Sequence, residues 1–164
     1  LNSKAEICVY VDVDMSCEQP LDRLLSRVTK DCVILGESNT HAFEVNNGII
    51  IKVGNCKVLG EMVQKLWSKY KEVQRANEVI RQVSEMQGVG FVPSRPDPIS
   101  FSGPGFVTKL LGHTEHEDVM VLPHRFFYPI SNQDRAKISL ENYKDFLPDD
   151  SEIFCVHFWG CDWQ

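Results

Sequence analysis

A long stretch of helical periodicity constrains this chain more than any other feature. Between residues 59 and 83, apolar side chains recur at three- and four-residue spacing, as on an amphipathic α-helix: Leu59, Met62, Val63, Leu66, Val73, Ala76, Ile80 and Val83. Gly88 then stands where glycine commonly ends a helix. The polar face mixes lysine, arginine and glutamate instead of being uniformly basic. We therefore interpret this helix as packed against a core and not as lying on a membrane.

Short apolar runs on both sides of this helix indicate strands, at residues 6–11, 32–35, 119–122 and 153–156. Residues 41–53 read as two strand segments joined at Asn46-Asn47-Gly48, because Asn-Gly is the strongest short hairpin signal. Further short helices are predicted over residues 20–25, 106–111 and 139–146, with a Gly/Pro-rich loop over 88–105. This interleaving predicts a single α/β domain over residues 1–164, with a mixed sheet flanked by helices.

Bulk composition excludes some classes of function. The chain has 164 residues, enough for one domain with a real core, and a net charge of −6. That charge argues against a general nucleic-acid binder, which shows a basic surface. No run reaches the ~18 apolar residues of a membrane span. We interpret Leu1 as an internal or processed residue, so an upstream targeting segment or anchor stays open.

Six cysteines are spread along the chain without a CxxC pair: Cys8, Cys17, Cys32, Cys56, Cys155 and Cys161. We interpret most of them as buried free thiols, which behave as small hydrophobic side chains. Disulfides in an oxidising lumen stay open as an alternative. The spacing Cys155-x-His157-x-x-x-Cys161 lacks the second ligand cluster that a structural zinc site needs.

An acidic pair follows the first predicted strand. Asp12 and Asp14 stand two positions apart after the apolar run that ends at Val11. On a strand, side chains at i and i+2 point to the same face, so both carboxylates are expected to converge. Carboxylate oxygens suit a divalent cation that also holds phosphate oxygens. The alternative interpretation is a pair of solvated aspartates at a strand-to-loop junction.

Six motifs in one order give the pair a context. They are YVDVD at 10–14, PLDRLL at 20–25, NNGII at 46–50, SGPGFVTKLL at 102–111, VLPHRFFYP at 121–129 and VHFW at 156–159. The set resembles the sugar-transferase domain with a DXD motif, the family-32 glycosyltransferases of the fungal outer-chain α-1,6-mannosyltransferase and inositol-phosphoceramide mannosyltransferase type. The resemblance covers about residues 7–163 and implies a GT-A-like fold.

The resemblance also implies a metal site. Asp12 and Asp14 would bind Mn²⁺ (or Mg²⁺) that bridges the diphosphate of a nucleotide-sugar donor, with Asp12 shared between the metal and the donor. His157 matches the late histidine that ligates the same ion. The alternative for His157 is a histidine packed beside Trp159.

Further donor- or substrate-binding positions follow from the same resemblance: Asn46, Asn47, Gly103, Pro104, Trp159 and Trp163. The asparagines would hydrogen-bond a sugar, and the tryptophans would stack on a sugar or a base. The alternatives are a hairpin turn for the asparagines and core packing for Trp159. No carboxylate is placed clearly enough to be named as a catalytic nucleophile.

The implied activity is a metal-dependent retaining glycosyltransferase. Its donor would be a GDP- or UDP-hexose of mannose, galactose or glucose type, and its acceptor a glycan or glycolipid. The expected location is the Golgi or secretory lumen in a eukaryote, and otherwise the cytoplasm. Two alternatives remain: a catalytically degenerate sugar- or protein-binding module, and a metal-dependent phosphoesterase.

The chain departs from the family pattern at its start. Ile7-Cys8-Val9 stands where family members carry Gly-Gly, and only residues 1–6 precede the first strand. We therefore expect a fragment that lacks the N-terminal nucleotide-binding half. Such a fragment would turn over nucleotide sugar poorly by itself.

Overall fold

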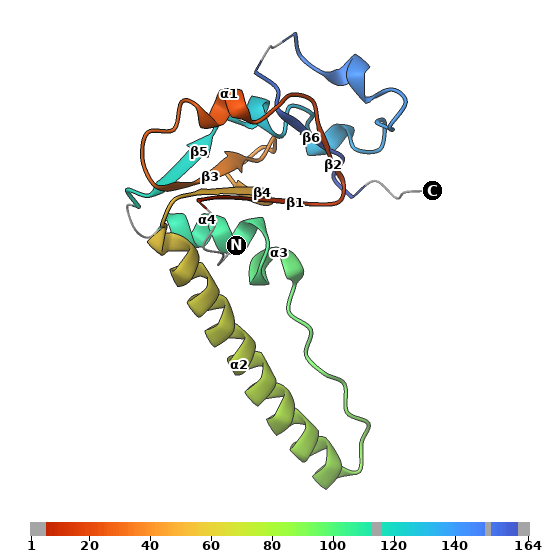
Figure 1. Ribbon diagram of the computed structural model, residues 1–164. Helices are drawn as coiled ribbons and strands as arrows, with labels where there is room; N and C mark the ends of the chain where they lie inside the picture. The colour runs from red at the N-terminus through yellow and green to blue at the C-terminus, as the bar shows by residue number, and fades with distance from the viewer. Residues whose placement is uncertain (1–5, 113–115, 150–151, 161–164) are drawn as a thin grey trace.

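A mixed four-stranded sheet organises the molecule. The computed structural model describes residues 6–112, 116–149 and 152–160 (Figure 1). The sheet has the order β1-β4-β3-β5, with β1 at Ile7–Val11, β4 at Val45–Val53, β3 at Cys32–Glu37 and β5 at Val119–Leu122. β4 is antiparallel to both neighbours, whereas β3 and β5 are parallel. The predicted α/β class with a mixed sheet and helices is therefore confirmed.

Both faces of this sheet are covered, which explains why β3 is apolar from Cys32 to Leu35. One face packs against α1 (Asp22–Leu25), against the short 3₁₀ helix η1 (His124–Phe126) with its following aromatic residues, and against the strand β6 (Cys155–His157). The other face packs against the start of α2 (Lys57–Gln87) and against α4 (Pro104–Leu111). Figure 1 shows these two layers above and below the sheet.

A smaller sheet joins the two ends of the chain. β2 (Met15–Cys17) pairs antiparallel with β6, so that Met15 lies opposite His157 and Cys17 opposite Cys155. A separate apolar cluster lies next to it: Ile130, Ile138, Tyr143, Ile153, Val156 and Phe158. The segment before β6 holds two 3₁₀ helices, η2 (Asn132–Asp134) and η3 (Tyr143–Phe146). Of the helix predicted over residues 139–146, only η3 is helical, and it is a 3₁₀ helix.

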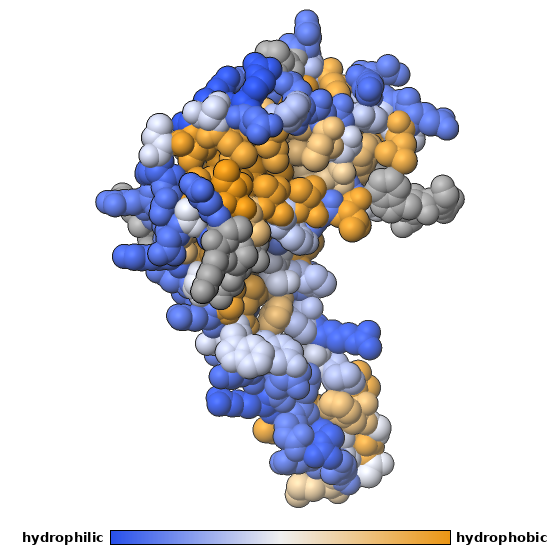
Figure 2. Space-filling view, in the orientation of Figure 1, coloured by the Kyte–Doolittle hydropathy of each residue, from blue (hydrophilic) through white to orange (hydrophobic). Residues whose placement is uncertain are grey.

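The long predicted helix is confirmed, but its packing differs from the prediction. α2 runs over 31 residues and ends at Gly88, which adopts φ 67° and donates its N–H to Glu85. Only Val58, Met62 and Ser84 along it are buried, and Trp67 is 56% exposed. The interpretation of the whole helix as core packing is therefore wrong. Most of α2 projects from the body (Figures 1 and 2), and residues 88–97 run back beside it (Figure 1).

The predicted hairpin at Asn46-Asn47-Gly48 is also wrong. These residues lie within the single nine-residue strand β4, and Gly48 is not among the described glycines with positive φ. β4 is hydrogen-bonded by β1 on one side and β3 on the other, and two partners favour an extended backbone over a turn. The β3–β4 register shifts between Ile34 and Gly36, which distorts the pairing beside these residues.

The Gly/Pro-rich segment contains one short helix that the sequence did not predict. α3 spans Pro98–Phe101, and the side chain of Asp97 caps it by accepting from the Ser100 N–H. α4 follows directly, as the sequence predicted. No helix in the described part of the chain is long and apolar enough to cross a membrane.

Candidate metal centre

Asp12 and Asp14 lie on the turn between β1 and β2. β1 ends at Val11, and the Asp12 N–H donates to the Gly48 carbonyl of the neighbouring strand at 2.7 Å. The Met15 N–H then donates back to the Asp12 carbonyl at 3.3 Å, which leaves Val13 at the tip, 91% exposed. The two carboxylates therefore converge through a turn and not through the strand alternation that the sequence suggested.

His157 reaches the same place from the other end of the chain. β6 carries it, and the pairing with β2 fixes its position: the Phe158 N–H donates to the Asp14 carbonyl at 2.9 Å. Its Nε2 lies 3.3 Å from Asp14 Oδ2. One ligand atom from each of Asp12, Asp14 and His157 lies within 4.8 Å of the other two.

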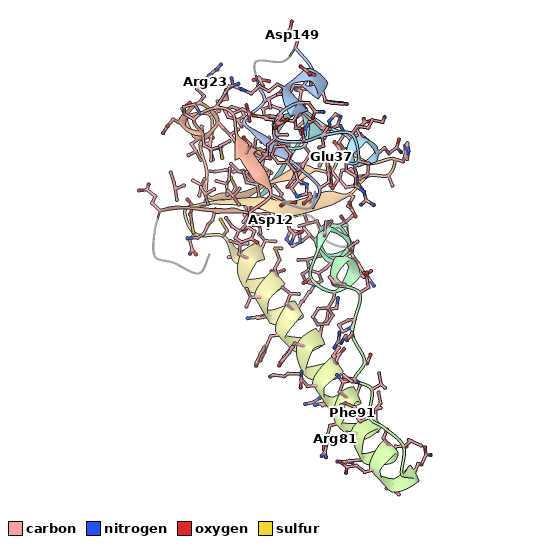
Figure 3. The ribbon with its side chains drawn as sticks, turned by 90° about the vertical axis from the view of Figure 1, so that its right-hand side faces the viewer. Asp12, Arg23, Glu37, Arg81, Phe91 and Asp149 are labelled. Carbon is pink, nitrogen blue, oxygen red and sulfur yellow. The ribbon has the colours of Figure 1, made fainter. Side chains whose placement is uncertain are left out.

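Backbone and phenol donors orient the two carboxylates. The Tyr10 hydroxyl donates to Asp12 Oδ1 at 2.6 Å, and this hydrogen bond raises the pKa of Tyr10. The Gly160 N–H donates to Asp14 Oδ2 at 2.6 Å. Each carboxylate thus accepts one of these hydrogen bonds through one of its oxygens. No donor among the described residues contacts Asp12 Oδ2. Figure 3 shows Asp12 beside the sheet.

The burial of His157 favours the neutral form of its imidazole. Burial lowers the pKa of His157, although Asp14 and Asp12 act in the opposite direction. A neutral ring has a lone pair to offer a cation. Its Nδ1 is buried and has no hydrogen-bond partner within the described ranges, so the ring is only half satisfied by the protein.

A glycine leaves space beside Asp12. A Cβ on Gly48 would lie 3.2 Å from Asp12 Oδ2 and 3.3 Å from the Tyr128 hydroxyl, so only glycine fits without displacement. Asn46 borders the same spot: its Oδ1 accepts from the Gly48 N–H at 2.8 Å, and its Nδ2 donates to Ser38 at 3.1 Å. Asn46 is therefore close to the acidic pair, with both ends of its amide engaged.

Other predicted binding residues lie farther from the acids. Asn47 donates to the Ser102 carbonyl at 3.3 Å, just before the loop residue Gly103. Pro104 begins α4, which packs on the sheet face opposite Tyr128. The structure thus groups Asn47, Gly103 and Pro104 away from the three candidate ligands. Trp163 lies outside the described residues.

Trp159 forms a wall of the site. Its ring contacts the His157 ring edge-on, with centroids 4.6 Å apart, and its Nε1–H donates to the Ile130 carbonyl at 3.0 Å. Trp159 adopts φ 58° and Gly160 φ 67°, a left-handed pair that turns the chain so that the Gly160 amide meets Asp14. A non-glycine residue in this conformation costs roughly 1–2 kcal/mol, which the surrounding contacts must offset.

Sequence reasoning missed the supporting role of two tyrosines. Tyr10 lies two residues before Asp12, and the same i, i+2 rule that paired the acids could have found it. Tyr128 is fully buried, and its hydroxyl also accepts from the Ile49 N–H at 3.1 Å. No local pattern announces this contact, because 79 positions separate the two residues.

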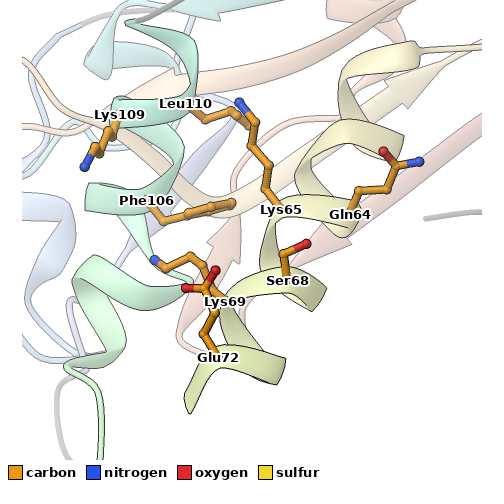
Figure 4. A pocket seen from close by; sticks show the side chains of 8 residues that line it. All are labelled: Gln64, Lys65, Ser68, Lys69, Glu72, Phe106, Lys109 and Leu110. Carbon is orange, nitrogen blue, oxygen red and sulfur yellow. The ribbon is translucent and has the colours of Figure 1, made fainter. Parts of the chain in front are cut away.

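A separate hollow lies on the far side of the sheet. It has a volume of about 600 Å³ between α2 and α4, with Phe106 and Leu110 among its apolar lining and Lys65, Lys69 and Lys109 at its polar edge (Figure 4). The Lys69 ammonium is engaged by the Ser100 and Phe101 carbonyls. None of the three candidate ligands lines this hollow.

Comparison with known protein families, curated proteins and solved structures identifies no relative of this chain. No family model matches the chain, and neither a curated protein nor a solved structure matches it.

The donor set fits a divalent cation. Two carboxylates and one neutral imidazole offer oxygen and nitrogen ligands of the kind that Mn²⁺ and similar ions accept. Ligand atoms on opposite sides of a hard divalent cation are about 4–5 Å apart, depending on the ion, and these three ligand atoms lie within 4.8 Å of one another. Asp12 Oδ2 accepts from no donor among the described residues, so this oxygen is available as a ligand atom.

Proposed function

We propose that this chain is a divalent-cation-dependent glycosyltransferase domain of GT-A-like fold, which transfers a hexose from GDP- or UDP-hexose to a glycan or glycolipid with retention of configuration. The observation that carries the proposal is the convergence of Asp12, Asp14 and His157. The pairing of β2 with β6 brings the two chain segments that hold these residues together. The order of the six sequence motifs supports the sugar-transferase class.

Each residue of the site has a definite role in this proposal. Asp12, Asp14 and His157 hold the cation, which supplies positive charge for the diphosphate of the departing nucleotide. Tyr10 and the Gly160 amide fix the orientations of Asp12 and Asp14. The bare backbone at Gly48 keeps the space beside Asp12 open for the donor.

Calorimetry on four proteins tests the proposal. Mn²⁺ and then a panel of UDP- and GDP-hexoses are titrated into the wild type, Asp14→Asn, His157→Gln and a control, Asp149→Asn. Asp149 is an exposed acid at the other end of the body from Asp12 (Figure 3). Asparagine keeps an oxygen for the Gly160 N–H, so Asp14→Asn removes charge with little change of shape.

We expect Mn²⁺ binding and Mn²⁺-dependent nucleotide-sugar binding in the wild type and the control. Both should weaken at least 10-fold in Asp14→Asn and His157→Gln, and chelation with EDTA should abolish the second. Nucleotide-sugar binding that persists unchanged in EDTA would contradict the proposal and point to a degenerate sugar-binding module. Mn²⁺-dependent hydrolysis of simple phosphoesters, without nucleotide-sugar binding, would contradict it in favour of a phosphoesterase.

A further inference from the structure

Two cysteines face each other across the strand pair that carries the metal-site residues. Cys17 is the partner of Cys155 in the β2–β6 register, and their sulfur atoms are 3.8 Å apart. Cys17 is exposed, whereas Cys155 is fully buried. Both are thiols in this structure.

The hydrogen-bond register suits a covalent bridge between them. The Phe158 N–H donates to the Asp14 carbonyl and the Glu18 N–H donates to the Phe154 carbonyl. Because hydrogen-bonded and non-hydrogen-bonded pairs alternate along an antiparallel ladder, the pair next to Glu18 and Phe154 is a non-hydrogen-bonded one. Cys17 and Cys155 occupy such a position. Their Cα atoms then lie closer than in hydrogen-bonded pairs, at about 4.5 Å in typical antiparallel ladders. This is within the range of roughly 4.4–6.8 Å that disulfides span.

We propose that Cys17 and Cys155 form a thiol–disulfide exchange site that reacts with low-molecular-weight disulfides of the glutathione type. The exposed Cys17 thiolate attacks one sulfur of the small disulfide, whose other half leaves as a thiolate and takes up a proton. The Cys155 thiol then gives up its proton and attacks Cys17, and the second half leaves as a thiolate that takes up a proton. Two protein thiols are oxidised, and the small disulfide is reduced to two thiols.

The bridge would lock the backbone of the candidate metal centre. Cys17 lies three residues after Asp14, and Cys155 lies two residues before His157. A bond between them closes a loop that joins positions 138 residues apart, and it holds β2 against β6. Long closed loops restrict the unfolded chain most in the chain-entropy account of disulfide stability. The consequence for cation binding rests on the proposed function, whereas the bridge itself does not.

Peptide mapping tests the bridge. The 164-residue chain is incubated with oxidised glutathione, blocked with iodoacetamide, and digested with a Glu/Asp-specific protease and chymotrypsin. The bridge would link a peptide spanning residues 15–18 to one spanning residues 155–158, which separates these cysteines from Cys8 and Cys161. The free-thiol count of the folded protein should fall by two, and dithiothreitol should restore it.

Two variants complete the test. In Cys17→Ser, which changes an exposed side chain, the linked peptide and the loss of thiols should both disappear. In Cys8→Ser, a control in β1, the strand that precedes β2 along the chain, both should persist. A wild-type chain that keeps all its thiols, or that yields only glutathione mixed disulfides or bridges between other cysteines, would overturn the inference.

Stability and metal binding separate this inference from the proposed function. The oxidised wild type should unfold at a higher urea concentration than the reduced protein, whereas Cys17→Ser should show no difference between the two conditions. Equal midpoints for oxidised and reduced wild type would count against a bridge in the native fold. A bridge with raised stability in a protein that binds no Mn²⁺ would uphold this inference and refute the proposed metal site.

Discussion

Replacement of Tyr128 by phenylalanine tests how the centre of the sheet is held beside Asp12. The Tyr128 side chain is fully buried, and its hydroxyl accepts from the Ile49 N–H at 3.1 Å. The Ile49 amide lies where the β3–β4 register shifts, so the phenol substitutes for a strand partner. Tyr128→Phe keeps the ring and deletes only this acceptor.

The expected cost follows from the buried amide that loses its partner. A buried donor left without an acceptor costs about 1–3 kcal/mol in the free energy of unfolding. For a chain of this size, 1 kcal/mol corresponds to about 2–4 °C in Tm. We therefore expect Tyr128→Phe to lower Tm by roughly 2–12 °C, with an unchanged far-UV circular dichroism spectrum.

Urea denaturation of matched variants provides the assay. Tyr70→Phe is the control, because Tyr70 is 45% exposed and lies on the projecting part of α2. Surface substitutions of this kind stay within about 0.5 kcal/mol of the wild type. If Tyr128→Phe were as stable as Tyr70→Phe, the argument that the phenol satisfies the Ile49 amide would fail.

Alkaline pH adds a second test of the same residue. Burial raises the pKa of Tyr128 above its ordinary value of 10.0. A phenol whose pKa is higher in the folded than in the unfolded protein stabilises the fold fully at pH values below the unfolded-state pKa. This contribution to the free energy of unfolding decreases as the pH rises above that pKa. The stability difference between wild type and Tyr128→Phe should therefore narrow between pH 9 and pH 11. A constant difference over this range would contradict the burial argument.

Three further predictions concern packing, thiols and the projecting helix. A Cβ at Gly36 would lie 2.6 Å from the Tyr128 ring, so Gly36→Ala should destabilise the protein by about 1–3 kcal/mol in urea denaturation; a smaller loss would show that the ring moves aside easily. Burial raises the pKa of the Cys32 thiol and shields it from reagents. After reduction of the protein, a thiol reagent at pH 8 should therefore label the exposed Cys17 at least 10-fold faster than Cys32. Equal labelling rates, measured by mass spectrometry, would contradict the burial of Cys32. Met86 is 88% exposed, so Met86→Ser should change the free energy of unfolding by less than about 0.5 kcal/mol, and a larger loss would show that the far end of α2 is packed.

Local sequence signals predicted most elements of the fold. The periodicity of α2 and its end at Gly88 depend on side-chain spacing and on the φ that glycine permits, both of which are properties of neighbouring residues. The apolar runs of β1, β3 and β5 are equally local. The packing of α2 is not determined by neighbouring residues. Apolar periodicity indicates which face of a helix is apolar, but it does not indicate whether another element packs against that face.

The Asn46-Asn47-Gly48 segment shows how tertiary context overrides a strong local signal. An Asn-Gly step favours a tight turn when only its neighbours matter. Here β1 and β3 flank the segment, and Gly48 is needed because Asp12 and Tyr128 approach its backbone. The glycine that suggested a turn serves close packing within a strand.

The ligand types of the candidate centre, two aspartates two positions apart and a late histidine, can be picked out from the amino-acid sequence alone. That these residues meet depends on the tertiary fold. The β2–β6 pairing brings His157 to Asp14, and the left-handed turn at Trp159 brings the Gly160 amide to the same carboxylate. Chain segments more than 140 positions apart converge only through long-range strand pairing, and the residue pattern near either end does not encode that pairing.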